Sequence, residues 1–192
     1  MEMSLKEHYE KKARSQKMML WFGMVSMFMM FAGLTSAYVV STSRPDWIND
    51  FKLPPAFMVS TVIIILSSIT FHFAKTAIQK GNRGTTSAML AATLVLGIFF
   101  VVCQFIGFGE VIKAGYFFTG PESTVTTSFL YIVTVVHLAH LVAGLIVLLV
   151  VIYNHFKQKY KPSQTLGIEL GAMFWHFLDI LWVYLFLFFY FF

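Results

Sequence analysis

Cysteine and charged residues are both scarce in this sequence of 192 amino acids. The single cysteine, Cys103, excludes an internal disulfide, and it excludes zinc and iron–sulfur sites that are built from several thiolates. Only 12% of the residues are charged, whereas a soluble domain averages about 25%. Because 58% of the residues are also hydrophobic, we interpret the chain as an integral membrane protein.

The N-terminus lacks the pattern of a cleavable signal peptide. Residues 1–17 are mostly charged or polar. The apolar run that follows them is too long for a secretory signal and has no clear small-residue cleavage site. We therefore expect residues 1–17 to form a cytoplasmic tail, either as a helix at the membrane interface or as a solvated segment.

Five apolar runs are long enough to cross a bilayer, since a spanning helix needs about 20 mostly apolar residues. No segment between them is long enough for a soluble domain. We predict an all-α integral membrane bundle that occupies residues 18–192. Its five transmembrane helices are expected at about residues 18–40, 54–78, 85–108, 126–156 and 167–192.

The lysines and arginines predict the orientation of the bundle. With the N-terminus inside, 11 of the 14 basic residues lie in inside segments, and the opposite topology inverts that ratio. The positive-inside rule therefore predicts the N-terminus inside and the C-terminus outside. The net charge of +5 does not indicate nucleic acid as a partner, because the basic residues lie at helix ends.

Four ionisable side chains in the last two predicted helices are candidate functional residues, because such groups are rare in membrane helices and usually face the protein interior. His137 and His140 lie three residues apart, as do His176 and Asp179, so each pair shares a helix face. At about 1.5 Å per residue, both pairs lie at a similar depth. The short connection makes the two helices neighbours. We therefore predict an interhelical polar network of these four residues, with Trp175 and Trp182 packed around it.

This cluster is compatible with more than one chemistry. One histidine from each helix could ligate a haem, three histidines with a carboxylate suit iron or zinc, and the cluster could also belong to a proton relay. A complete relay across the membrane is disfavoured, because only this cluster and Glu169 lie deep enough in the bilayer. The favoured interpretation is structural, because polar side chains also lock helices together in bilayers. We expect no catalytic residue and no metal site on this chain. Glu169, near the inner surface, is the residue for which a proton-related role stays open.

Two motifs in these helices resemble subunit III of the haem–copper cytochrome c oxidases. Residues 167–182 are similar to that family's pattern G-x-E-x-x-A-x-x-W-H-F-x-D-x-x-W, and residues 134–144 are similar to its pattern T-x-x-H-x-x-H-x-x-x-G. Three earlier segments also fit the family in order, namely residues 31–38, the proline-led helix with its turn at 53–83, and residues 93–104. The resemblance therefore covers residues 18–192.

The chain also departs from this family. Many members have seven helices, and the first two, which form one arm of a lipid-holding cleft, have no counterpart here. Met27 follows Ser26 where members commonly have a glutamate, and Gly107 stands where they often have an acid. Proton-handling roles of those two carboxylates therefore do not carry over to this chain.

The resemblance implies an accessory subunit of a haem–copper terminal oxidase in aerobic respiration. Such a subunit binds no cofactor itself, stabilises the catalytic subunit I that contains haem and copper, holds phospholipid and supports proton uptake. The implied location is a bacterial inner (cytoplasmic) membrane, with other oxidase subunits and a larger respiratory supercomplex as further partners. The electron donor stays open.

Two alternatives accompany this interpretation. The chain could be the subunit III-like partner of a quinol oxidase or of a nitric oxide reductase. An alternative of another class is a small haem-binding electron carrier of the membrane, because the histidines of the last two helices could ligate a haem. A transporter is disfavoured, since no helix has a midplane Gly/Pro break.

Overall fold

The computed structural model describes residues 5–48, 53–120, 123–160 and 164–191. Its elements, in chain order, are α1 (Leu5–Val40), the short 3₁₀ helix η1 (Ser41–Ser43), α2 (Pro55–Gln79), α3 (Arg83–Lys113), α4 (Val125–Phe156) and α5 (Leu166–Phe191). Each of the five α-helices is long and apolar enough to cross a membrane. The chain is therefore a multi-pass membrane protein, and the predicted all-α fold with five spans is confirmed. Its orientation in the membrane stays a prediction.

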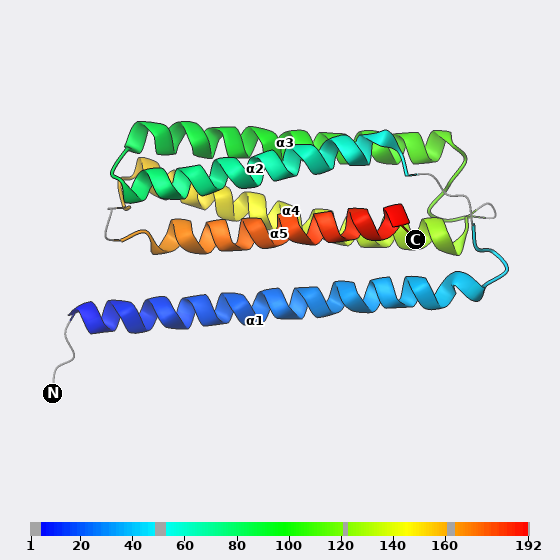
Figure 1. The fold of residues 1–192 in the computed structure, drawn as a ribbon, viewed down its shortest axis with the longest axis horizontal. Coiled ribbons are helices and arrows are strands. Elements are labelled where there is room, and N and C mark those ends of the chain that lie inside the picture. The colour runs from blue at the N-terminus through cyan, green and yellow to red at the C-terminus, as the bar shows by residue number, and fades with distance from the viewer. Residues whose placement is uncertain (1–4, 49–52, 121–122, 161–163, 192) are drawn as a thin grey trace.

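The five long helices run side by side along one axis (Figure 1). Helices α2 and α3 form the most extensive pair, and α5 contacts α1, α2 and α4. Helix α1 packs mainly on α4 and α5, at one edge of the bundle (Figure 1). The predicted contact between the last two helices is confirmed, but α5 is equally a neighbour of α2.

Helices α1 and α3 are longer than the helices that the hydrophobic runs predict. Helix α1 begins at Leu5, so the described part of the predicted tail, residues 5–17, continues the first span as one helix. Its lysines, glutamates and Ala13 are good helix formers, which hydropathy does not detect. Helix α3 extends to Lys113, beyond the predicted end at residue 108.

Helix α3 ends just before Gly115, whose backbone is left-handed. Gly115 has a φ of +86°, and the N–H groups of Gly115 and Tyr116 donate to the carbonyls of Ile112 and Val111. This is the Schellman arrangement that commonly closes helices. Helix α4 ends in the same way, but Gln158, at a φ of 56°, occupies the position that favours glycine.

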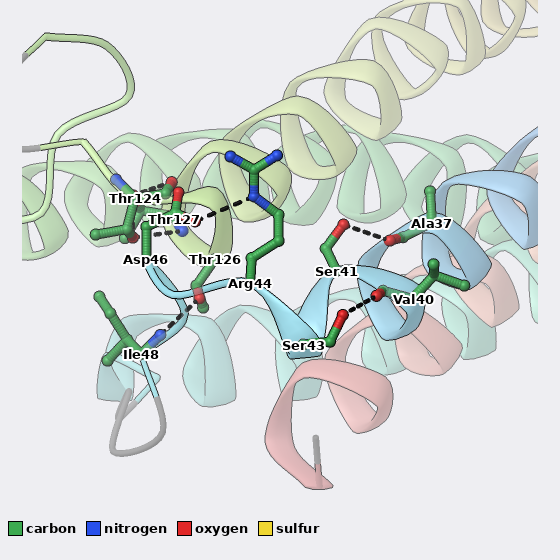
Figure 2. Close-up of polar contacts among 10 residues, drawn as sticks. All are labelled: Ala37, Val40, Ser41, Ser43, Arg44, Asp46, Ile48, Thr124, Thr126 and Thr127. Carbon is green, nitrogen blue, oxygen red and sulfur yellow. Dashed lines mark hydrogen bonds and ion pairs between the residues drawn. The ribbon is translucent and has the colours of Figure 1, made fainter.

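The loop after α1 is tied to the start of α4. Figure 2 shows the backbone N–H of Ile48 donating to Thr126 Oγ1, at 3.1 Å. In the same loop, Arg44 Nε donates to Asp46 Oδ1 at 3.0 Å, and this bond lowers the pKa of the Asp46 carboxyl. Thr124 and Thr127 cap the first turn of α4 reciprocally. These contacts hold the end of α1 next to the start of α4, on the same side of the membrane.

Gly144 allows α4 to approach α5 closely, and Gly97 of α3 makes room for the Trp175 side chain of α5. A Cβ atom at Gly144 of α4 would lie 2.7 Å from Leu178 Cδ1, and one at Gly97 of α3 would lie 3.0 Å from the Trp175 ring. Lipid tails are as apolar as leucine, so van der Waals packing of this kind stabilises contacts between membrane helices. Trp175 and Leu178 are accordingly part of the buried core.

Candidate functional site

Both tryptophans of α5 bind hydroxyl groups of α2. Trp175 Nε1 donates to Ser67 Oγ and Trp182 Nε1 donates to Thr61 Oγ1, each at 3.1 Å. Both indoles are buried. A buried indole N–H requires an acceptor, so these two bonds fix the rotation of α5 against α2.

His176 continues the contact between α5 and α2. Its Nδ1 lies 2.6 Å from Ser68 Oγ, and its ring centroid lies 6.3 Å from that of His72 on α2. Nε2 of His176 makes no hydrogen bond within the described part of the chain. The side chain is half-buried and lines a crevice between α1, α2 and α5.

Asp179 is the most deeply placed acid of α5. Its side chain is 3% exposed, and neither carboxyl oxygen has a hydrogen-bond partner among the described residues. The Ser68 hydroxyl is the neighbouring polar group, although its geometry falls short of a hydrogen bond. A buried carboxyl group without partners is costly in free energy, which marks this position as one that demands an explanation.

The two histidines of α4 lie on the other side of α5. His137 is 1% exposed, and neither of its nitrogens has a partner in the described ranges. Its ring packs 5.1 Å from the centroid of Trp182 and also contacts Phe31 and Phe100. His140 Nδ1 lies 2.7 Å from the carbonyl oxygen of Val136, one turn back on its own helix.

The four residues of the predicted network are therefore not joined directly. Among the described residues, no hydrogen bond links any two of His137, His140, His176 and Asp179. The network itself stays a prediction. The structure brings α2 hydroxyls to α5 instead, and the sequence did hold a signal for them, because serine and threonine in a membrane helix commonly bond across helices.

Glu169 lies one helical turn into α5 and joins it to α1. Its Oε2 accepts from Lys17 Nζ at 2.8 Å, and its Oε1 accepts from Thr165 Oγ1 at 2.7 Å. Both charged side chains are partly exposed. A partly exposed ion pair is worth about 0–1 kcal/mol, so this contact positions α1 more than it stabilises the fold.

Two hollows open beside α5. The crevice between α1, α2 and α5 has a volume of about 400 Å³ and carries ionisable groups, whereas an apolar groove of about 540 Å³ lies between α1, α4 and α5. No group of three or more His, Cys, Asp or Glu side chains in the described residues is arranged to hold a metal ion. In the described structure, the histidines of α4 and the histidine of α5 contact different neighbours, so together they do not form a set of ligands for one metal ion or haem.

The fold and the buried polar residues of α5 define a multi-pass helical membrane protein. The chain belongs to the cytochrome c oxidase subunit III family, because the profile of the family described as "Cytochrome c oxidase subunit III" matches residues 5–192. The predicted family resemblance is thereby confirmed.

Named relatives come from bacteria and animals. The chain is 31% identical to a cytochrome c oxidase subunit 3 of Corynebacterium diphtheriae, across 83% of this chain and 79% of the relative. It is 28% identical to a cytochrome bo(3) ubiquinol oxidase subunit 3 of Pseudomonas putida, across 86% and 80%. It is 30% identical to a cytochrome c oxidase subunit 3 of Drosophila yakuba, across 85% of this chain but 61% of the relative.

Proposed function

We propose that this chain is an accessory subunit of a haem–copper terminal oxidase in aerobic respiration. It packs against the catalytic subunit I, which contains the haem and copper, and stabilises that subunit during turnover. The observation that carries this proposal is the family match over residues 5–192. The relatives named above are subunits of oxidases that differ in electron donor, which supports an accessory role common to both types.

The polar chemistry of the chain supports a structural role. The indoles of α5 donate to hydroxyls of α2, and Glu169 pairs with Lys17, so these groups serve contacts between helices. Apolar side chains are exposed on α1, α3 and α4, among them Phe22 and Met29. Such faces suit lipid tails or the helices of a larger membrane subunit.

The orientation of the chain and its membrane belong to the same proposal. The N-terminus lies inside and the C-terminus outside, because this topology puts 11 of the 14 basic residues inside. The membrane is the inner membrane of a bacterium, which the two bacterial relatives favour. A phospholipid occupies the apolar groove between α1, α4 and α5, which Leu20, Val147 and Phe174 help to line.

Co-purification tests the proposal. The full-length chain carries an affinity tag at its N-terminus and is extracted from its native membrane in mild detergent. We expect one large haem-containing subunit to accompany it, and we expect the chain purified alone to show no Soret band. A Soret band in the isolated chain would instead support the haem-binding electron carrier, and recovery without any large subunit would contradict the proposal.

A quinol oxidase is the second candidate for the partner complex. It is favoured by the relative from Pseudomonas putida, whose name is that of a ubiquinol oxidase subunit. The two candidates differ in the substrate of the purified complex. Oxidation of reduced cytochrome c supports the first, and oxidation of ubiquinol without cytochrome c supports the second.

A further inference from the structure

The crevice between α1, α2 and α5 is unusually rich in ionisable groups for a membrane protein. Every helix that surrounds it contributes at least one such group to the lining, which includes Lys17, His72, Lys75, Glu169 and His176. Charged groups at membrane depth face a water-filled cavity or pair with one another. Among the described residues, Lys17 and Glu169 form the only ion pair in the crevice, so we expect water beside His72 and Lys75.

The inner wall of this crevice leads to Asp179. His176 lines the crevice, and its Nδ1 lies 2.6 Å from Ser68 Oγ. The Ser68 hydroxyl in turn faces the Asp179 carboxyl, whose two oxygens lack hydrogen-bond partners among the described residues. A histidine, a hydroxyl and a carboxyl group thus follow one another from the crevice to the protein interior, with a hydrogen bond between the first two.

We propose that the α1–α2–α5 crevice is a water-filled path that ends at Asp179, and that His176 and Ser68 pass protons between them. The function of this path is proton exchange between Asp179 and the aqueous phase at the end of the bundle where α1 begins. The proposal goes beyond an accessory role and does not depend on which oxidase the chain serves.

Release transfers one proton from Asp179 to water in the crevice, uptake transfers one proton back, and no other reactant takes part. When Asp179 releases its proton, Ser68 Oγ accepts it and passes its own hydroxyl proton to His176 Nδ1. His176 then releases the proton on Nε2 to water in the crevice. The carboxylate remains on Asp179, and the same steps in reverse restore the acid and the original histidine tautomer.

The path is closed beyond Asp179. On the same helix, Trp182 is buried and is held by Thr61, and further along Tyr184 bonds Thr35 of α1. On α4, His137 and His140 make no hydrogen bond to Asp179 in the described structure. Asp179 therefore takes up and returns protons on one side and does not carry them across the membrane.

Infrared spectroscopy of isotope-labelled protein tests this proposal. The full-length chain is produced with ¹³C-labelled aspartate side chains and placed in lipid nanodiscs. Asp179 is the only aspartate within the predicted spans, since Asp46 and Asp50 lie between the first two. The ¹³C-shifted carboxylic acid band therefore reports on Asp179, and its rate of shift after mixing with D₂O reports proton exchange.

Three variants separate this path from simple solvent leakage. His176→Phe and Ser68→Val each remove one relay group while leaving Asp179 and filling its space. His140→Phe is the matched control, because it removes a half-buried imidazole whose hydrogen bond stays within its own helix, and a phenyl ring can keep its packing against Phe31. Circular dichroism confirms that each variant keeps the helical content of the parent chain.

We expect the Asp179 band to shift promptly in the parent chain and in His140→Phe. In His176→Phe and Ser68→Val the shift should slow roughly tenfold or more, because each change removes a group through which the proton passes. A band that does not exchange in the parent chain would overturn the proposal. Equal exchange rates in all four proteins would also overturn it, whichever oxidase the chain serves.

Discussion

Replacement of Gly144 by alanine tests how tightly α4 and α5 are packed. The new Cβ would lie 2.7 Å from Leu178 Cδ1, and Leu178 is fully buried, so its side chain has little room to move. Overpacking a core position costs about 1–3 kcal/mol. Alanine stabilises a helix relative to glycine by about 1 kcal/mol, and this gain offsets part of that cost. The expected net destabilisation is therefore about 0–2 kcal/mol.

Gly33→Ala provides the matched control. Gly33 lies on α1, is exposed, and would place its new Cβ within 4 Å of no other atom. This variant gains the same helix preference without any strain. Thermal unfolding of both variants in nanodiscs should therefore show Gly144→Ala less stable than Gly33→Ala by about 1–3 kcal/mol. Equal stabilities would refute the close packing of α4 against α5.

Three further changes test other parts of the structure. Gln158→Gly should stabilise the chain by about 1 kcal/mol in the same thermal assay, because the backbone of residue 158 is left-handed and glycine adopts that conformation without strain. Trp175→Phe should lower stability by about 1–3 kcal/mol through a lost hydrogen bond and lost packing, whereas Trp21→Phe at an exposed position should have little effect. A double-mutant cycle of Lys17→Met and Glu169→Gln should give a coupling of at most about 1 kcal/mol that weakens with salt. Loss of stability in Gln158→Gly would contradict the strain at the end of α4. Equal effects of the two tryptophan changes would contradict the Trp175–Ser67 bond, and a large, salt-independent coupling would contradict the partly exposed ion pair.

The sequence predicts the helices of this protein better than their ends. Long apolar runs identify the five spans, because a bilayer imposes a minimum length on each. They do not place the start of α1 at Leu5, because the residues before Met18 are polar but still helix-forming. The end of α3 depends on Gly115, whose left-handed backbone a hydropathy pattern does not reveal.

The sequence identified residues of the candidate site but did not identify the side chains that contact them. Ionisable groups at membrane depth single out His176 and Asp179 without a structure. The short α4–α5 connection makes the two helices neighbours, yet it does not determine the rotation of α5 about its own axis. In the structure His176 and Asp179 turn toward Ser68 of α2, and His137 of α4 meets Trp182 instead. That rotation is fixed by the hydrogen bonds of Trp175 and Trp182 to α2, whose partners a hydropathy pattern does not identify.

The working life of the oxidase tests the central claim most directly. Oxygen consumption is recorded over many turnovers for the complex with this chain and for the complex assembled without it. An accessory, stabilising subunit predicts that both complexes begin at similar rates and that the complex without the chain loses activity sooner. Complete loss of the initial rate in a complex that is still assembled would contradict the account, because it would assign this chain a direct part in the catalytic reaction.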